Sequence, residues 1–262
     1  MLLPLMERAR ESGKPDPLIK DDYARDIVER LDFDNSLFAD MRPGCGMDFN
    51  PAVARAYTID QTLIKMIEKY PDMTVVNIGA GLDTTFRRVD NGKIRWYDLD
   101  FPDTIDLRRE LLPESERDEY IPKSILDKTW YKDIRVRGAK VFFMASGVLC
   151  YVKPDGVKGL FLDLIEEFPE SEILFDIMSR FLVWMGNIQR LRKMGLDKSA
   201  YIKWGLNSAK KFGRWSGKIH VMEEYPIFAR VPVNKEWNEK TISQIKTMNF
   251  FKWFKMVHLK LG

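Results

Sequence analysis

The sequence predicts an α/β fold built around a mostly parallel β-sheet. Along its 262 residues, short apolar segments with strand character alternate with longer segments whose apolar residues recur at helical spacing. The first clear strand, in the stretch TVVNIGAG, runs directly into two glycines. Because 45% of the residues are hydrophobic, the chain can bury a large core, and we expect one domain with elaborations rather than two domains.

Seven segments are predicted as strands, and most of the segments between them as helices. The predicted helix over 51–70 has an apolar face that includes Val53, Ile59 and Leu63, and Pro71 ends it. A second helix over 154–168 has Pro154 at its start, where a backbone N–H is not needed. The predicted strands, in order, are 74–80, 94–100, 120–124, 140–145, 172–177, 218–223 and 255–260.

Charge and cysteine content argue against several classes of function. The 42 basic and 39 acidic residues are interspersed and leave a formal charge of +3, without a basic block suited to nucleic acid. Cys45 and Cys150 lie far apart and outside any ligand pattern, so we expect neither a disulfide nor a metal site. No apolar run is long enough to span a bilayer. The expectation is a cytoplasmic protein with no nucleic-acid or membrane partner.

The turn after the first strand is the strongest candidate for a binding site. Gly79 and Gly81 lack a Cβ, so a ligand can approach the backbone closely, and the helix that follows offers unpaired N–H groups. Asp98 and Asp100 lie 17 and 19 residues past Gly81, at the end of the second predicted strand. That spacing suits a carboxylate that accepts hydrogen bonds from the two ribose hydroxyls of a nucleoside ligand.

Two ligands with a nucleoside use this architecture, a dinucleotide and S-adenosylmethionine. A dinucleotide fingerprint needs a third glycine where this chain has Thr84. Asp83 would repel a pyrophosphate, but its charge suits the amino group or the sulfonium of S-adenosylmethionine. The pattern therefore favours S-adenosylmethionine, and a role for Asp83 as a helix cap stays open as the alternative.

Four stretches in a fixed order resemble one family of enzymes. They are VVNIGAGLDTTFRRV, RWYDLDFPDTIDLRR, SILDKTW and SGVLCYVKPDGV, and the shorter DPLIKDDYA and VARAYTID agree with them. Together they are similar to the leucine carboxyl methyltransferase family, which includes the tetracenomycin-type polyketide O-methyltransferases, over about residues 9–179. The resemblance implies a class I methyltransferase (Rossmann-like) fold, with a seven-stranded mixed sheet whose last strand is antiparallel. It also implies S-adenosylmethionine as cofactor and carboxylates as acceptors.

The resemblance assigns roles to single residues around the cofactor. Arg55 is implied to bind the carboxylate of the methionine part, for which a forked guanidinium is suited. Gly79 and Gly81 match the family's glycine turn. Asp100 matches the ribose-binding acid, and Asp98 matches a position that is also often acidic, so both are kept and Asp100 is preferred.

Two further positions complete the expected cofactor site. Ser124 and Ile125, after the third strand, match residues that line the adenine, and Asp127 is either a further adenine contact or the N-cap of the next helix. Ser146 departs from the family, which carries an acid at this place after the fourth strand. A hydroxyl can still form hydrogen bonds but adds no negative charge, so an altered or relaxed site is expected here.

The chain is predicted as a single methyltransferase domain over 1–262. It divides into a helical N-terminal extension (1–72), a cofactor-binding core (73–180), a lid insertion (181–217) and closing strands (218–262). The lid insertion contains large residues that either line an acceptor cavity or pack the lid onto the sheet, and both interpretations stay open. These residues are Trp184, Met185, Met194, Trp204 and Trp215.

The expected activity is O-methylation of a carboxylate on a small molecule or a peptide end. A carboxylate is ionised at neutral pH and needs no general base, so no catalytic residue is assigned and alignment should carry the rate. His220 and His258 are expected to be structural, because both lie in predicted strands. Two alternatives remain: methylation of a phenol or alcohol, for which His220 would be the base, and a non-catalytic nucleoside-binding module. The oligomeric state is left open.

Overall fold

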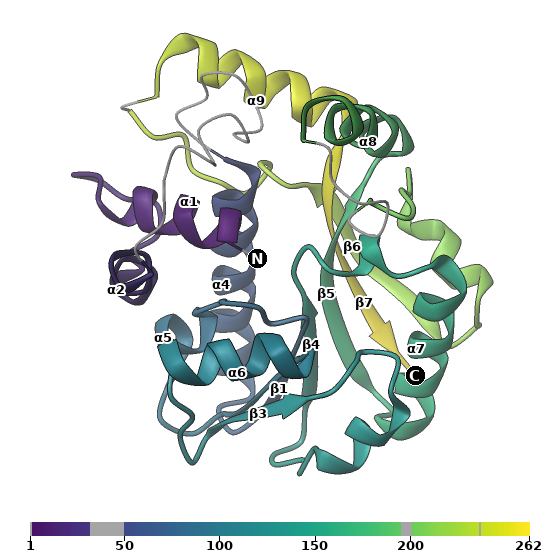
Figure 1. The fold of residues 1–262 in the computed structure, drawn as a ribbon. Coiled ribbons are helices and arrows are strands. Elements are labelled where there is room, and N and C mark those ends of the chain that lie inside the picture. The colour runs from purple at the N-terminus through teal and green to yellow at the C-terminus, as the bar shows by residue number, and fades with distance from the viewer. Residues whose placement is uncertain (1, 32–49, 195–200, 236) are drawn as a thin grey trace.

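The computed structural model describes residues 2–31, 50–194, 201–235 and 237–262, with the side chains of 189–194 left out. Seven strands form one central sheet, with helices on both of its faces (Figure 1). All seven predicted strands are confirmed, with ends that shift by up to three residues. Their bounds are β1 Thr74–Ile78, β2 Arg95–Asp100, β3 Asp118–Pro122, β4 Val141–Ala145, β5 Ser171–Met178, β6 Ile219–Pro226 and β7 Phe254–Leu261.

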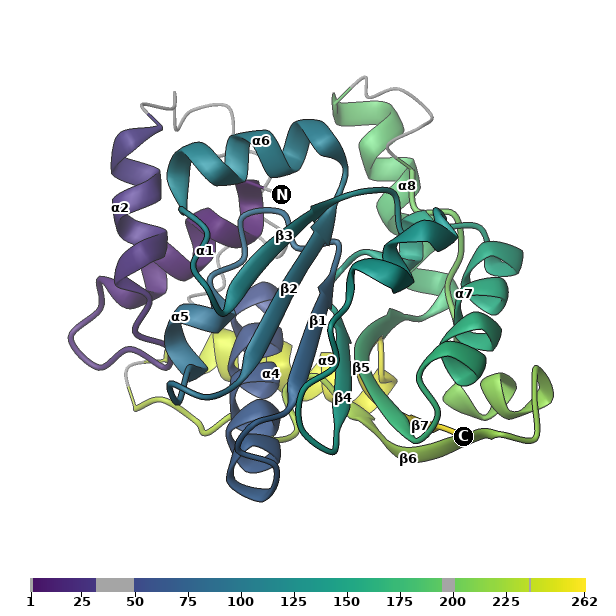
Figure 2. The ribbon, with the colours of Figure 1, turned by 90° about the horizontal axis from the view of Figure 1, so that it is seen from below.

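The strands lie in the order β3-β2-β1-β4-β5-β7-β6 (Figure 2). The first five strands pair in parallel, whereas β7 pairs antiparallel with both β5 and β6. The predicted mixed sheet with an antiparallel last strand is therefore confirmed. The chain moves outward from β1 to β3 and then returns to β4 on the other side of β1, so the order reverses between β1 and β4. Ligands of such sheets bind outside the carboxyl ends of the strands at this reversal.

Eight α-helices and three 3-10 helices have bounds among the described residues. The predicted helix at 51–70 is confirmed as α4, where Asn50 caps the start by accepting a hydrogen bond from the Ala52 N–H at 2.8 Å. The helices are α1 Leu2–Ser12, α2 Asp22–Arg30, α4 Pro51–Lys69, α5 Thr85–Val89, α6 Pro102–Leu111, α7 Pro154–Glu167, α8 Arg180–Met194 and α9 Glu239–Phe251, with η1 Lys128–Asp133, η2 Leu149–Tyr151 and η4 Ala209–Arg214.

Each face of the sheet has its own apolar core, because neighbouring residues of a strand point to opposite faces. Val76 of β1 belongs to the core under α7, together with the buried rings of Phe161 and Phe175. Val75 belongs to the core under α4, together with Ile59 and other residues of that helix. Figure 1 shows α4 and α7 on opposite sides of the sheet. The carboxyl edge of the strands is thus held between two packed layers.

Part of the lid insertion packs onto the sheet. The rings of Trp204 and Trp215 lie against Phe212 of η4, which is itself buried, and the Trp204 Nε1–H donates to the Leu149 carbonyl at 2.8 Å. The packing interpretation is confirmed for these two residues. Trp184 behaves differently, because 62% of it is exposed. Residues 195–200 and the side chain of Met194 lie outside the described residues.

Candidate cofactor site

The glycine turn has a backbone that only glycine adopts readily. Gly79 and Gly81 have φ angles of +70° and +51°, in the left-handed region. A Cβ on Gly79 would lie 2.5 Å from Cγ2 of Val148, which follows β4. The N–H groups of Gly79 and Ala80 both donate to the Leu99 carbonyl, at 2.7 and 3.1 Å. The turn therefore lies closely between the ends of β2 and β4.

Asp100, the last residue of β2, faces this turn. Its Oδ2 accepts a hydrogen bond from the Gly81 N–H at 2.7 Å, and its Oδ1 accepts from the Phe101 N–H at 2.8 Å. The residue is half-buried, so part of the carboxylate remains accessible. Each carboxylate oxygen can accept a second hydrogen bond, which leaves capacity for two ribose hydroxyls.

Asp98 occupies a different environment and does not reach the site. It is fully buried, forms an ion pair with Arg108, and accepts hydrogen bonds from Trp96 Nε1 at 2.9 Å and Asn77 Nδ2 at 2.8 Å. Arg108 in turn donates to the carbonyls of Gly81 and Asp83 at 3.1 and 2.6 Å. The structure corrects its proposed role as a ribose ligand: Asp98 has no exposed surface, and it supports the glycine turn from beneath.

Asp83 lies half-buried just after the turn, among three arginines. Its Oδ2 accepts from the Thr85 N–H at the start of α5 and from Asn77 Nδ2, both at 3.3 Å. Burial alone would raise the pKa of Asp83, but the nearby guanidinium groups of Arg8 and Arg88 outweigh it and lower the pKa. Thr84 rather than Asp83 is the N-cap of α5, so Asp83 supports the start of the helix from one residue before the cap.

Arg55 extends from α4 across the ends of β4 and β5. Its Nη1 lies 3.3 Å from Oδ2 of Asp176, and a Cβ on Gly147 would lie 2.6 Å from the same nitrogen. The other oxygen of Asp176 accepts from the Gly147 N–H at 2.6 Å. Nε of Arg55 is buried and has no hydrogen-bond partner among the residues that the structure describes. The guanidinium is therefore held by one carboxylate at the sheet edge, with donor capacity left over.

Asp176 was not predicted from the sequence. It lies in β5 between apolar residues, in the stretch ILFDIM, and is 6% exposed. An acid inside an otherwise apolar strand was the available signal, because a buried carboxylate needs a partner. Ser146 lies half-buried at the end of β4, directly before Gly147. Asp176 thus brings a carboxylate to the place where Ser146 lacks the family's acid.

The segment after β3 has a self-contained turn. Ser124 Oγ accepts from the Leu126 N–H at 3.2 Å, and Asp127 caps η1 by accepting from the Thr129 N–H at 2.9 Å. The N-cap interpretation of Asp127 is confirmed. Ser124 and Ile125 are both half-buried at the carboxyl edge of the sheet, beside the strand that ends at Asp100.

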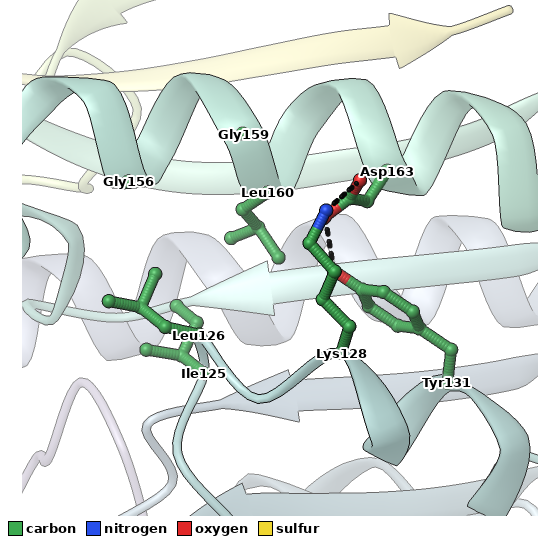
Figure 3. Close-up of a pocket in the computed structure, with 8 residues that line it drawn as sticks. All are labelled: Ile125, Leu126, Lys128, Tyr131, Gly156, Gly159, Leu160 and Asp163. Atoms are coloured by element: carbon green, nitrogen blue, oxygen red, sulfur yellow. Dashed lines mark hydrogen bonds and ion pairs between the residues drawn. The ribbon is translucent and has the colours of Figure 1, made fainter.

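A hollow of about 140 Å³ lies between this segment and α7 (Figure 3). Ile125 and Leu126 line one end, and Lys128 forms an ion pair with Asp163 at 2.8 Å at the other. The hollow is smaller than the cavities of roughly 300–1,000 Å³ that hold drug-sized ligands. It is a surface depression beside the predicted adenine segment rather than a cofactor pocket.

Buried charges from the N-terminal helices reach the glycine turn. Arg8 of α1 donates to the Leu82 carbonyl at 2.8 Å and to Asp21 at 2.9 Å. Asp21 also accepts from Thr84 Oγ1 at 2.6 Å and from Arg88 at 2.8 Å, and caps α2. Burial would raise the pKa of Asp21, but Arg88 and Arg8 outweigh it and lower the pKa. This network gives the stretch DPLIKDDYA a structural role, one that sequence reasoning missed.

Neither histidine lies at the carboxyl edge. His220 is exposed near the start of β6, and its register partner is Lys260, at the opposite end of the sheet. His258 is buried in β7 with its Nε2 2.8 Å from Glu172, and its ring packs on Phe142. The structural role expected for both histidines fits these positions, and His220 is too remote to serve as a base. Among the described residues, no group of His, Cys, Asp and Glu side chains could hold a metal ion.

The arrangement brings most of the predicted cofactor residues to one edge of the sheet. Five predicted parts of the site lie at or over the carboxyl ends of β1 to β5: Arg55, the glycine turn, Asp100, the segment at 124–125 and Ser146. Asp98 lies beneath them. The sequence profile described as "Leucine carboxyl methyltransferase" matches residues 2–164. The chain belongs to the leucine carboxyl methyltransferase family. Membership makes it an S-adenosylmethionine-dependent methyltransferase, which confirms the resemblance noted in the sequence.

Two curated relatives agree with this family. The chain is 25% identical over 211 residues to the tetracenomycin polyketide synthesis O-methyltransferase TcmP of Streptomyces glaucescens, covering 80% of this chain and 75% of that protein. It is 27% identical over 221 residues to the S-adenosyl-L-methionine-dependent methyltransferase dpfgK of Gibberella zeae, covering 77% and 74%.

Solved structures share the fold of this family member. A DUF574 family protein from Streptomyces avermitilis superposes with a TM-score of 0.60 at 12% identity, covering 99% of this chain and 97% of that one. A SAM-dependent methyltransferase from Anabaena variabilis has a TM-score of 0.54 at 10% identity, covering 80% and 85%. At these identities the likeness shows the fold alone.

Proposed function

We propose that this methyltransferase transfers a methyl group to the carboxylate oxygen of a small molecule, forming a methyl ester. The observation that carries the proposal is the absence of a described histidine from the carboxyl edge, because a carboxylate acceptor is the one that needs no base. Asp100, against the glycine turn, and Arg55, over the end of β5, support the cofactor part of the proposal. The family's activity and the named small-molecule pathway of TcmP support the acceptor class.

The residues at the edge fit S-adenosylmethionine. The guanidinium of Arg55, whose Nε has no partner in the described part of the chain, suits the carboxylate of the methionine part. Asp176 or Asp83 suits its amino group. Asp100 has accessible oxygens for the ribose hydroxyls. Ser124 and Ile125 would line the adenine, and Ser146 would lie near the methionine part. Each of these roles is part of the proposal.

Methyl transfer asks mainly for alignment and exclusion of water. When bound, S-adenosylmethionine supplies a methyl carbon that is already activated by the sulfonium. The methyl–sulfur bond breaks as the carbon–oxygen bond forms, so S-adenosylhomocysteine and an ester are the products. The acceptor carboxylate is ionised near neutrality, with an ordinary pKa of about 4, so no group needs to remove a proton. This agrees with an edge at which no described histidine lies.

Two alternatives have less support. Methylation of a phenol or alcohol would need a base, and His220, the candidate from the sequence, lies at the opposite end of the sheet. A non-catalytic nucleoside-binding module rests on Ser146 alone, and Asp176 supplies a carboxylate beside that position. A peptide carboxylate as acceptor remains compatible with the proposed chemistry, although TcmP, as named, serves polyketide synthesis.

The proposal is tested by incubating the protein with labelled methyl donor and a panel of carboxylic acids, phenols and amines, and by analysing the labelled products. We expect a labelled product that releases methanol in mild alkali, because esters hydrolyse there and ethers and N-methyl groups do not. An alkali-stable product would overturn the carboxylate assignment and leave the methyltransferase assignment standing.

A further inference from the structure

Five aromatic rings form an exposed cluster at the junction of α8 and α9. Phe181 and Trp184 belong to the first turns of α8, Phe250 and Phe251 end α9, and Trp253 follows. We call this cluster the aromatic face. The first four residues are 51%, 62%, 79% and 57% exposed, in this order. Large apolar side chains that gather in solvent in this way mark interaction sites.

The rings of the aromatic face contact one another. Phe181 lies 6.1 Å from Trp184 and 5.9 Å from Trp253, measured between ring centroids. Phe251 stacks on Trp253 at 5.5 Å and touches Phe250 at 5.1 Å. Figure 1 shows the end of α9 beside α8 at the top of the molecule. The two helices therefore meet through a continuous apolar surface that faces outward.

Positive charge surrounds the aromatic face. Beyond Glu239 in its first turn, α9 contains no acid, and the sequence of α8 has none either. Arg180, Lys246 and Lys252 are exposed, and none of them forms an ion pair with the described residues. Lys252 has a left-handed backbone, with φ of +51°, and it ends α9 between Phe251 and Trp253. Lys252 thus lies between two rings of the aromatic face.

We propose that the aromatic face docks on the surface of a bilayer that contains anionic lipids. Aromatic rings lie well at the boundary between headgroups and acyl chains, and flanking Lys and Arg side chains bind anionic headgroups. Docking needs no spanning segment, and among the described residues no helix is long and apolar enough to cross a membrane. The proposal departs from the sequence-based expectation of no membrane partner.

The charge pattern favours a lipid surface over the other occupants. A nucleic acid would need a longer track of cations than the three unpaired ones among the described side chains of this face. A second copy of the chain would bring the same cations face to face, which opposes self-association. An anionic bilayer complements both the rings and the charge.

The aromatic face also borders the candidate cofactor site. α8 begins two residues after the end of β5, the strand that carries Asp176. A docked protein would hold the rim of the carboxyl edge near the lipid, where an apolar acid partitions. The docking itself does not depend on methyl transfer, so it can be tested separately.

Vesicle sedimentation tests the proposal with the full chain. We expect binding to phosphatidylcholine vesicles that contain about 30 mol% phosphatidylglycerol, with weakening as salt rises and little binding to phosphatidylcholine alone. The double variant F250S/F251S should lose at least about tenfold in vesicle affinity, and K246E/K252E a similar amount. Two matched controls should bind as the unmodified protein does. They are V233S, at an apolar residue elsewhere that is 68% exposed, and K210E/K211E, at two exposed lysines of η4.

Several results would overturn the docking proposal. They are absence of binding to anionic vesicles, equal losses in the controls, and unchanged binding by F250S/F251S. A dimer in light scattering that F250S/F251S converts to a monomer would assign the face to a second copy, and polyuridylate binding lost in the same variant would assign it to nucleic acid. S-adenosylmethionine binding measured by calorimetry should stay unchanged in every variant, which separates this proposal from the proposed function.

Discussion

Asp98 and Asp100 stand two residues apart on β2, and their surroundings give them different roles. Asp100 is half-buried and has accessible oxygens, so Asp100→Ala should lower S-adenosylmethionine affinity by about 1.5–3 kcal/mol, the usual value of a hydrogen bond to a charged group. Calorimetry measures this loss directly. Because the side chain is partly exposed, the melting temperature should change little.

Asp98→Ala should act on stability instead. It leaves Arg108 buried without its carboxylate, a change that typically costs about 3–5 kcal/mol. Urea unfolding measures the free energy of unfolding of the two variants. The roles of the two residues would be reversed if the Asp98→Ala protein were stable but did not bind the cofactor, and the Asp100→Ala protein bound it normally.

Arg55 offers a more selective test at the same scale. Its proposed partner is the carboxylate of the methionine part, which adenosine lacks. Arg55→Leu should therefore weaken S-adenosylmethionine binding by about tenfold or more and leave adenosine binding nearly unchanged, as titration of both ligands would show. Equal losses for the two ligands would instead place Arg55 near the nucleoside or in the folding of the edge.

Glu172 of β5 forms an ion pair with His258 of β7, and we expect it to make the stability of the protein depend on pH. Burial would raise the pKa of Glu172, but hydrogen bonds from His258 and Lys140 outweigh it and lower the pKa from 4.5 to about 2. A lowered folded-state pKa stabilises the protein fully above the unfolded value, and the contribution is lost as pH falls from about 4.5 to 2. Glu172→Gln cannot ionise, so its deficit in free energy of unfolding should shrink between pH 5 and pH 3. Urea titrations at pH 5 and pH 3 measure this deficit in the free energy of unfolding. A deficit that stays constant or grows at pH 3 would contradict this account.

At the scale of whole elements, the buried charges of α1 and α2 are expected to hold the glycine turn. Asp21→Asn removes the charge shared by Arg8 and Arg88, so amide hydrogen exchange should rise in α1, α2 and residues 79–84 while β5 and β7 stay protected. Asp26→Asn is the matched control, because Asp26 forms an exposed ion pair on the same helix. Similar amide hydrogen exchange in the two variants would show that the buried charges of these helices do not stabilise the turn.

These elements were predictable to the extent that local pattern decides them. Seven strands and the helices at 51–70 and 154–168 follow from apolar spacing and proline placement, which are properties of short segments. The roles of Asp98 and Asp176 were not predictable in this way, because each depends on a partner from another element, Arg108 or Arg55. The Asp21–Thr84 bond spans 63 positions, so no local pattern could indicate it.

At the scale of the whole molecule, the strand order places the glycine turn at the reversal between β1 and β4, where the site residues gather. The division into extension, core, lid and closing strands remains a prediction, and so does the acceptor. The proposed roles of the site residues depend on one claim, that this edge binds S-adenosylmethionine rather than a dinucleotide.

Calorimetry of the purified protein with S-adenosylmethionine and with NAD tests that claim most directly. We predict saturable binding of S-adenosylmethionine and none of NAD, because Thr84 stands at the third glycine position of a dinucleotide turn and Asp83 beside it carries a negative charge. Saturable binding of NAD without binding of S-adenosylmethionine would contradict the account.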